Sequence, residues 1–197
     1  MLEIDTLSRP GIGPISLRVA DGECVAITGA SGSGKSMLLR AIADLDPNSG
    51  MVSTQSGARA AMPAPEWRRK VAYLPAESGW WADTVAQHFD TPETVDLGTL
   101  GVPPDAMAWE VARLSSGERQ RLAFLRLLSH QPEVLLLDEP TAPLDEDNTA
   151  LFEQRLHRCL ENGTSVVLVT HDPAQAKRMA GRHLVLADGK LTEAAHG

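Results

Sequence analysis

Residues 29–36, Gly-Ala-Ser-Gly-Ser-Gly-Lys-Ser, combine residue types and a spacing that suit the binding of phosphate groups. They match the pattern GxxxxGK[ST], in which glycines let backbone N–H groups curl around an anion without clashes from Cβ atoms. Lys35 adds a positive charge for the β- and γ-phosphates, and Ser36 adds a hydroxyl for magnesium. The predicted nucleotide contacts are Gly29, Ala30, Ser31, Gly32, Ser33, Gly34, Lys35, Ser36 and, through its backbone, Met37.

Two consecutive acids, Asp138 and Glu139, follow the aliphatic run Val134–Leu137. Asp138 can hold a magnesium ion through water, and Glu139 is placed to polarise an attacking water molecule. Acids also occur at strand ends without any function, but the phosphate loop upstream favours the catalytic interpretation. Together the two motifs predict that the chain binds and hydrolyses ATP with Mg²⁺ as cofactor.

The elements that must position these residues are aliphatic strands alternating with helical patterns. Strands are predicted at Glu23–Thr28, Val71–Leu74, Val134–Asp138, Ser165–Thr170 and His183–Ala187. Helices are predicted at Lys35–Leu45, Gly117–Ser129, Glu146–Leu160 and Ala174–Ala180. This alternation is typical of a parallel sheet covered on both faces. The predicted fold class is therefore α/β, a phosphate-loop NTPase core of mostly parallel strands with helices on both faces.

Three segments depart from this alternation. The N-terminus, up to about residue 20, predicts antiparallel β-strands around the turn Arg9-Pro10-Gly11. Residues 46–66 are rich in Pro, Ser, Gly and Ala and indicate a loop with one weak strand. Residues 75–113 are interpreted as a short helical subdomain inserted in the core. Residues 1–74 and 114–197 then form the ATPase core itself.

Composition restricts the classes of function. The 197 residues include 18 Lys+Arg and 26 Asp+Glu, which gives a net charge of -8. A broad surface for a nucleic-acid backbone is therefore not expected. The dense basic run Arg68-Arg69-Lys70 is interpreted as a solvated face.

Cysteine usage and hydropathy predict a cytoplasmic location. Cys24 and Cys159 form no CxxC pair, which fits a reducing compartment. The acidic start lacks the basic and apolar regions of a signal peptide. The longest purely aliphatic runs have four residues, against the roughly 20 apolar residues that a membrane span needs. Any role at a membrane is expected to depend on a partner.

The segment Leu114–Gln120, Leu-Ser-Ser-Gly-Glu-Arg-Gln, narrows the function further. A Ser-Gly pair that opens a helix offers a second anion site, although alone it would more often be a simple N-cap. Because this segment occurs together with the other motifs, the chain resembles the ATP-binding cassette (ABC) ATPases over essentially its whole length. The segment resembles LSGGQ with Ser116 and Glu118 as variants, Ala142–Asp145 looks like the D-loop, and His171 looks like the switch histidine.

The resemblance implies a shared mechanism. In the family, two cassettes face head to tail, and each ATP contacts the phosphate loop of one copy and the signature of the other. Because this chain has one copy of each motif, a homodimer is expected. The resemblance adds signature contacts from Ser115, Ser116 and Gly117, a D-loop contact from Asp145, and catalytic roles for Glu139, His171 and Lys35. It also implies a separate transmembrane permease, which holds this chain on the cytoplasmic face of the inner or plasma membrane. No nucleic-acid partner is expected.

The chain departs from the family pattern at several positions. Ala76 stands where a glutamine is expected to read the γ-phosphate, and Met37 replaces a second hydroxyl beside the α-phosphate. No aromatic residue is available to stack on adenine from the first hairpin, so Arg9, through its guanidinium plane, and Ile12 are the candidates. Reduced coupling or hydrolysis is the expectation that follows from Ala76.

Several interpretations stay open from the sequence. Trp80, Trp81 and Phe89 either form a groove for the membrane partner or fill the core of the small insertion. The leading function is the ATPase of an ABC transporter, and the compact length looks similar to small subunits of metal-ion exporters. The alternatives are a soluble ABC ATPase in nucleic-acid or protein-assembly work and a weakly hydrolysing regulator.

Overall fold

A six-stranded sheet forms the centre of the computed structural model, which describes residues 1–194. Five neighbouring strands in the order β9-β3-β8-β7-β6 are parallel, and β10 adds an antiparallel edge. The strands are β3 (Cys24–Thr28), β6 (Val71–Leu74), β7 (Val134–Asp138), β8 (Ser165–Val169), β9 (Arg182–Ala187) and β10 (Lys190–Glu193). β7 and β8 are buried along their whole length, as their continuous aliphatic sequences require.

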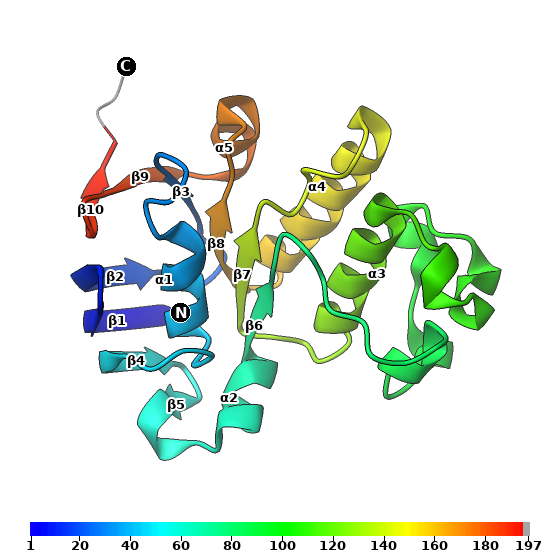
Figure 1. Cartoon of the computed structure of the whole chain (residues 1–197), viewed down its shortest axis with the longest axis horizontal. Coiled ribbons are helices and arrows are strands. Elements are labelled where there is room, and N and C mark those ends of the chain that lie inside the picture. Colours follow the sequence, from blue (N-terminus) through cyan, green and yellow to red (C-terminus); the bar gives the residue numbers. More distant parts are fainter. Residues whose placement is uncertain (195–197) are drawn as a thin grey trace.

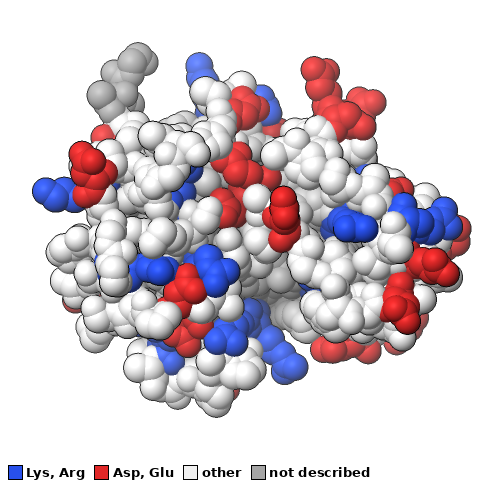
Figure 2. Space-filling view, in the orientation of Figure 1, with Lys and Arg blue, Asp and Glu red and all other residues white. Residues whose placement is uncertain are grey.

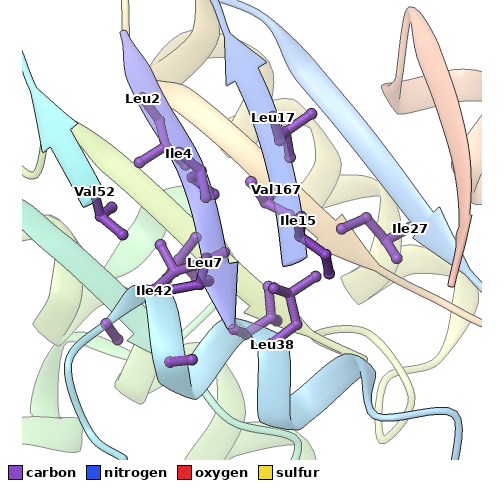
Figure 3. Packing of buried hydrophobic residues seen from close by; sticks show 14 of the residues in the cluster. Leu2, Ile4, Leu7, Ile15, Leu17, Ile27, Leu38, Ile42, Val52 and Val167 are labelled. Carbon is purple, nitrogen blue, oxygen red and sulfur yellow. The ribbon is translucent and has the colours of Figure 1, made fainter. Parts of the chain in front are cut away.

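A second, antiparallel sheet lies against one face of the first (Figure 1). Its order is β2-β1-β4-β5, with β1 (Leu2–Arg9), β2 (Ile12–Val19), β4 (Ser49–Thr54) and β5 (Gly57–Ala58). Leu7 and Ile15 from this sheet point toward Leu38 and Ile42, which lie on a helix between the two sheets (Figure 3). The predicted antiparallel strands at the N-terminus are confirmed.

Helices cover both faces of the parallel sheet, so the predicted fold class is confirmed. One hydrophobic cluster joins α1 to the antiparallel sheet and to one side of β7 and β8. A second joins the other side of those strands to α3, α4 and α5, with Phe124 of α3 stacked on Phe152 of α4 at 4.2 Å. The helices are α1 (Lys35–Ile42), α2 (Ala64–Lys70), α3 (Ser116–Leu128), α4 (Glu146–Glu161) and α5 (Pro173–Met179).

Two sequence-based element predictions were wrong. The first helix ends at Ile42 rather than Leu45, because Asp44 adopts a left-handed φ of 58° and Pro47 follows. Residues 46–66 are not mainly loop, since they hold β4, β5 and the start of α2. That short helix is fixed by Trp67, which is fully buried and donates its indole N–H to the Ile42 carbonyl at 3.0 Å.

The segment between β6 and α3, predicted as a short helical insertion, is built of short 3₁₀ turns, and its division from the core as a subdomain stays a prediction. Its prolines and glycines stop longer helices from forming. The turns are η2 (Ala86–His88), η3 (Pro92–Thr94), η4 (Leu97–Leu100), η5 (Pro104–Ala108) and η6 (Val111–Arg113), and a further 3₁₀ turn, η1 (Arg59–Ala61), precedes α2. Buried apolar residues anchor the segment on α3 and α4, among them Leu97 and Leu100. None of the helices within residues 1–194 has the length and apolar character of a membrane span.

Candidate nucleotide-binding site

The phosphate loop connects the end of β3 to the first residue of α1, as the sequence predicts. Gly29 and Gly34 have φ values of 148° and 99°, a region that favours glycine. A Cβ atom at Gly29 would lie 2.4 Å from the Leu186 carbonyl oxygen, and one at Gly34 would lie 2.9 Å from Cδ1 of Ile12. The backbone conformation therefore favours glycine at both positions, and at Gly29 a side chain would also clash with backbone.

Lys35 is 6 % exposed and folds back over its own loop. Its Nζ donates to the carbonyl oxygens of Gly29 and Ala30 at 2.9 and 3.0 Å. The hydroxyl of Ser33 is buried and has no hydrogen-bond partner among residues 1–194. A cation held at the mouth of a loop with an unpaired buried hydroxyl fits a phosphate group.

The acids and the histidine lie on strands that neighbour the phosphate loop. β8 lies between β3 and β7, so Asp138 at the end of β7 and His171 just after β8 share one sheet edge with the loop. A cavity of about 390 Å³ is lined by both Gly29 and His171. Ser36 and Asp138 offer the hard oxygen ligands that Mg²⁺ prefers, in a number that leaves room for phosphates and water.

Glu139 contacts His171 directly. The His171 backbone N–H donates to Oε2 of Glu139 at 3.1 Å, and its Nε2 lies 3.2 Å from Oε1. Glu139 has a left-handed φ of 49°, and its own N–H donates to the Val169 carbonyl at 2.9 Å. Strained backbone of this kind costs roughly 1–3 kcal/mol and gathers at functional sites. The two contacts between Glu139 and His171 bring the predicted general base and the predicted switch histidine together.

The signature segment begins α3 through a capping box. Ser115 accepts from the Glu118 N–H at 3.2 Å, and the Glu118 carboxylate accepts from the Ser115 N–H at 2.8 Å. Hydrogen bonds to this carboxylate from the Ser115 backbone N–H, which is the largest cause, and from the Ser115 hydroxyl lower the pKa of Glu118. The variant residue Glu118 thus has a structural role that keeps the helix N-terminus in place. Ser115 and Ser116 are exposed.

The D-loop packs against the signature. A Cβ atom at Gly117 would lie 3.0 Å from the Pro143 carbonyl oxygen, so the two segments form one surface. Asp145 caps α4 by accepting from the Asn148 N–H at 2.8 Å, a bond that lowers the pKa of this exposed carboxyl. Within residues 1–194 no hydrogen bond or ion pair joins Ser115–Gly117 to the phosphate loop, and Figure 1 shows α1 and α3 on separate parts of the molecule.

Two contacts at the site were missed by the sequence analysis. Gln120 of α3 is 2 % exposed and holds the segment after β6, because its Nε2 donates to the Pro75 carbonyl at 3.1 Å and its Oε1 accepts from the Ser78 hydroxyl at 2.8 Å. Ala76 lies inside this held segment and is exposed. The second contact joins the hydroxyl of Tyr73 to Asp138. Neither contact has a local sequence signal.

Arg9 and Ile12, the two candidates for contact with adenine, differ in exposure and in their contacts. Arg9 donates to Asp46 at 2.7 Å and to the Met37 carbonyl at 3.4 Å, which holds its guanidinium beside the start of α1. Arg40 and Arg9, in that order, lower the pKa of Asp46 by hydrogen bonding. Ile12 is only 3 % exposed and packs against Gly34. The geometry favours Arg9 over Ile12, and contact of Arg9 with adenine stays a prediction.

Comparison with known proteins identifies the family. The family model described as "ABC transporter" matches residues 12–142. The chain is 34% identical to a phosphate import ATP-binding protein of Natronomonas pharaonis over 91% of this chain and 72% of the relative. It is 37% identical to an aliphatic sulfonates import ATP-binding protein of Xanthomonas axonopodis over 90% of this chain and 62% of that relative. The chain belongs to the ABC transporter family, as an ATP-binding subunit with the ATPase activity of that class.

Solved structures show the same fold. An ATP-binding subunit of an ABC transporter matches with a TM-score of 0.84 at 23% identity, covering 98% of this chain and 89% of the other. A dimeric ATP-binding cassette in a post-hydrolysis state, bound to ADP and Pi, matches with a TM-score of 0.82 at 24% identity over 100% of both chains. The phosphate-loop fold expected from the motifs is therefore confirmed.

Proposed function

We propose that this chain binds ATP with Mg²⁺ and hydrolyses it as the energy-coupling subunit of an ABC transporter, working with a separate membrane permease. The observation that carries the proposal is the convergence of the phosphate loop, Asp138, Glu139 and His171 at one edge of the parallel sheet. The relatives are named as importers of different cargoes, so the cargo does not follow from them. The likeness to small metal-exporter subunits stays a prediction.

Each polar group at the site has a distinct part in the proposed reaction. The N–H groups of the loop and Lys35 hold the phosphates, and Ser36 and Asp138 hold Mg²⁺, which supplies charge neutralisation when bound. Glu139 takes a proton from the attacking water. His171 holds the Glu139 carboxylate and donates to the γ-phosphate. In the structure Lys35 is bonded to its own loop, so ATP binding must exchange those bonds for phosphate oxygens.

The active form is proposed to be a head-to-tail homodimer. Ser115 and Ser116 are exposed at the start of a 13-residue helix, where free N–H groups and the helix dipole favour an anion. Their own chain does not bring them to the phosphate loop, so the γ-phosphate bound by a second copy is the proposed ligand. Asp145 lies on the same surface, next to the contact between Gly117 and Pro143.

A membrane partner is proposed to contact the segment after β6. Trp81 is 72% exposed, and the Arg126 guanidinium lies 4.8 Å from the ring centroids of both Trp80 and Trp81. Phe89 is 7% exposed and belongs to the core, so it is left out of this surface. Gln120 ties the same segment to the signature helix, which gives a physical route between the partner and the shared ATP site.

Surface charge supports a protein partner over nucleic acid. On the face in Figure 2, basic and acidic side chains are interspersed rather than gathered by sign. With a net charge of -8, such a surface suits no long phosphate backbone. The proposed location is the cytoplasmic face of a membrane, where the permease would hold the chain.

The test is reconstitution with each candidate membrane protein whose gene lies beside the gene of this chain. Lipid vesicles that hold this protein are expected to recruit the chain and to raise its rate of phosphate release from ATP. Replacing Trp81 by Ala is expected to weaken the recruitment, whereas Met51→Ala, at an exposed apolar residue of β4, serves as the matched control. An ATPase rate that is indifferent to the membrane protein would contradict the transporter assignment.

A further inference from the structure

Tyr73 lies beside the predicted magnesium ligand without belonging to any motif. Its hydroxyl donates to Oδ2 of Asp138 at 3.0 Å. Tyr73 is on β6, next to β7, and in the register of the two strands it pairs with Leu136, two residues before Asp138. Neighbouring parallel strands thus aim the phenol along the sheet toward the carboxylate. The side chain is half-buried against the cluster around α1.

The direction of this hydrogen bond is set by the chemistry of the two groups. A carboxylate has only acceptor oxygens, whereas the Tyr73 phenol carries an O–H group. The phenol therefore donates, and the carboxylate accepts. Asp138 is 5% exposed, and Tyr73 is its one side-chain hydrogen-bond donor within residues 1–194. One oxygen is thereby engaged and the other left for a ligand.

We propose that Tyr73 is a positioning residue that sets the affinity of the site for Mg²⁺ by fixing the Asp138 carboxylate. The inference rests on the proposed function, since it assumes that Asp138 holds the ion. Groups that hydrogen-bond to a metal-binding carboxylate orient it, and their loss typically weakens metal binding by about 10–100-fold. Ala76, three residues further along, offers no polar side chain to this edge of the sheet.

The test is Tyr73→Phe, which removes one oxygen atom and keeps the ring that packs the core. Mn²⁺ binding to the full-length chain, saturated with a non-hydrolysable ATP analogue, is measured by electron paramagnetic resonance. The dissociation constant for Mn²⁺, and for Mg²⁺ in competition, is expected to rise by about 10–100-fold. Affinity for the analogue without metal is expected to stay unchanged, and turnover is expected to recover at saturating Mg²⁺.

Ser165→Ala is the matched control for a merely structural effect. Ser165 is fully buried, and its hydroxyl donates to the Ala20 carbonyl at 2.9 Å, at the start of β8 and far along the strand from the site. Both variants lose one hydrogen-bonded hydroxyl, but only Tyr73→Phe is expected to change metal binding. Unchanged or tighter Mn²⁺ binding by Tyr73→Phe would overturn the inference alone. A wild-type chain that binds no nucleotide would overturn the proposed function with it.

Discussion

Replacing Glu139 by Gln is expected to lower the rate of phosphate release from ATP by about 10²–10⁴-fold, the usual contribution of a general base. The amide has the shape of the carboxylate but cannot take a proton from water. The amide oxygen can still accept from the His171 N–H, which now binds the carboxylate at 3.1 Å, so the loop should keep its conformation. The rate is measured on purified protein with saturating Mg²⁺ and ATP, and ATP affinity is expected to change little.

Glu161→Gln provides the control for this variant, since Glu161 is an exposed acid at the end of α4. It should hydrolyse ATP at the wild-type rate. Equal, slow rates in the wild type and in Glu139→Gln would contradict the motor interpretation. They would favour the alternative in which Ala76 leaves the chain a nucleotide-dependent regulator.

Replacing Lys35 by Met is expected to weaken ATP binding by about tenfold to a hundredfold. The ammonium contributes charge-assisted hydrogen bonds to phosphate, each worth roughly 1.5–3 kcal/mol, and about 1.4 kcal/mol corresponds to a factor of ten in affinity. Methionine keeps the apolar stem of a side chain that is 6 % exposed, so the fold is expected to survive. The measurement is a fluorescence titration with a labelled ATP analogue, alongside thermal unfolding.

Lys177→Met removes an exposed lysine from α5 and should leave the affinity for ATP unchanged. If Lys35→Met bound ATP as tightly as the wild type, the ammonium would have no role in phosphate binding. The bonds from Lys35 to Gly29 and Ala30 would then be purely structural.

The features that the sequence predicts well are those with local causes. Residues 29–36 carry their glycines at the positions where the loop has left-handed φ values, and the aliphatic runs of β7 and β8 need burial on both faces. The capping box of Ser115 and Glu118 is likewise a pattern of two residues three apart. In each case the signal and the structure span the same few residues.

The elements that the sequence did not predict are short, and α2 depends on contacts with residues outside the helix. The seven residues of α2 are too few to form a stable helix alone. The helix depends on the buried indole of Trp67 and its bond to Ile42, which no window of sequence reveals. β10 is also absent from the predicted strands, although the turn Asp188-Gly189 before it is a dipeptide typical of hairpins.

The parts of the candidate site that the sequence does not predict are contacts between residues far apart in the chain. Gln120 reaches Pro75 and Ser78 across more than forty positions of sequence, and Tyr73 reaches Asp138 through the register of two strands. Both depend on which strands are neighbours and how they align. A motif names the residues of a site, whereas these contacts decide how each residue is held.

If two copies share each ATP, mixing two impaired variants should create a site that neither variant has alone. Lys35→Met impairs only the phosphate loop. Ser116→Glu puts a carboxylate at the start of α3, where it suits the helix dipole but repels a phosphate. In a mixed head-to-tail dimer both changes fall in one site and leave the other intact. We expect mixing to restore about a quarter of wild-type ATP turnover, since half of the dimers have one good site of two. Turnover no higher than the average of the separate variants would contradict it.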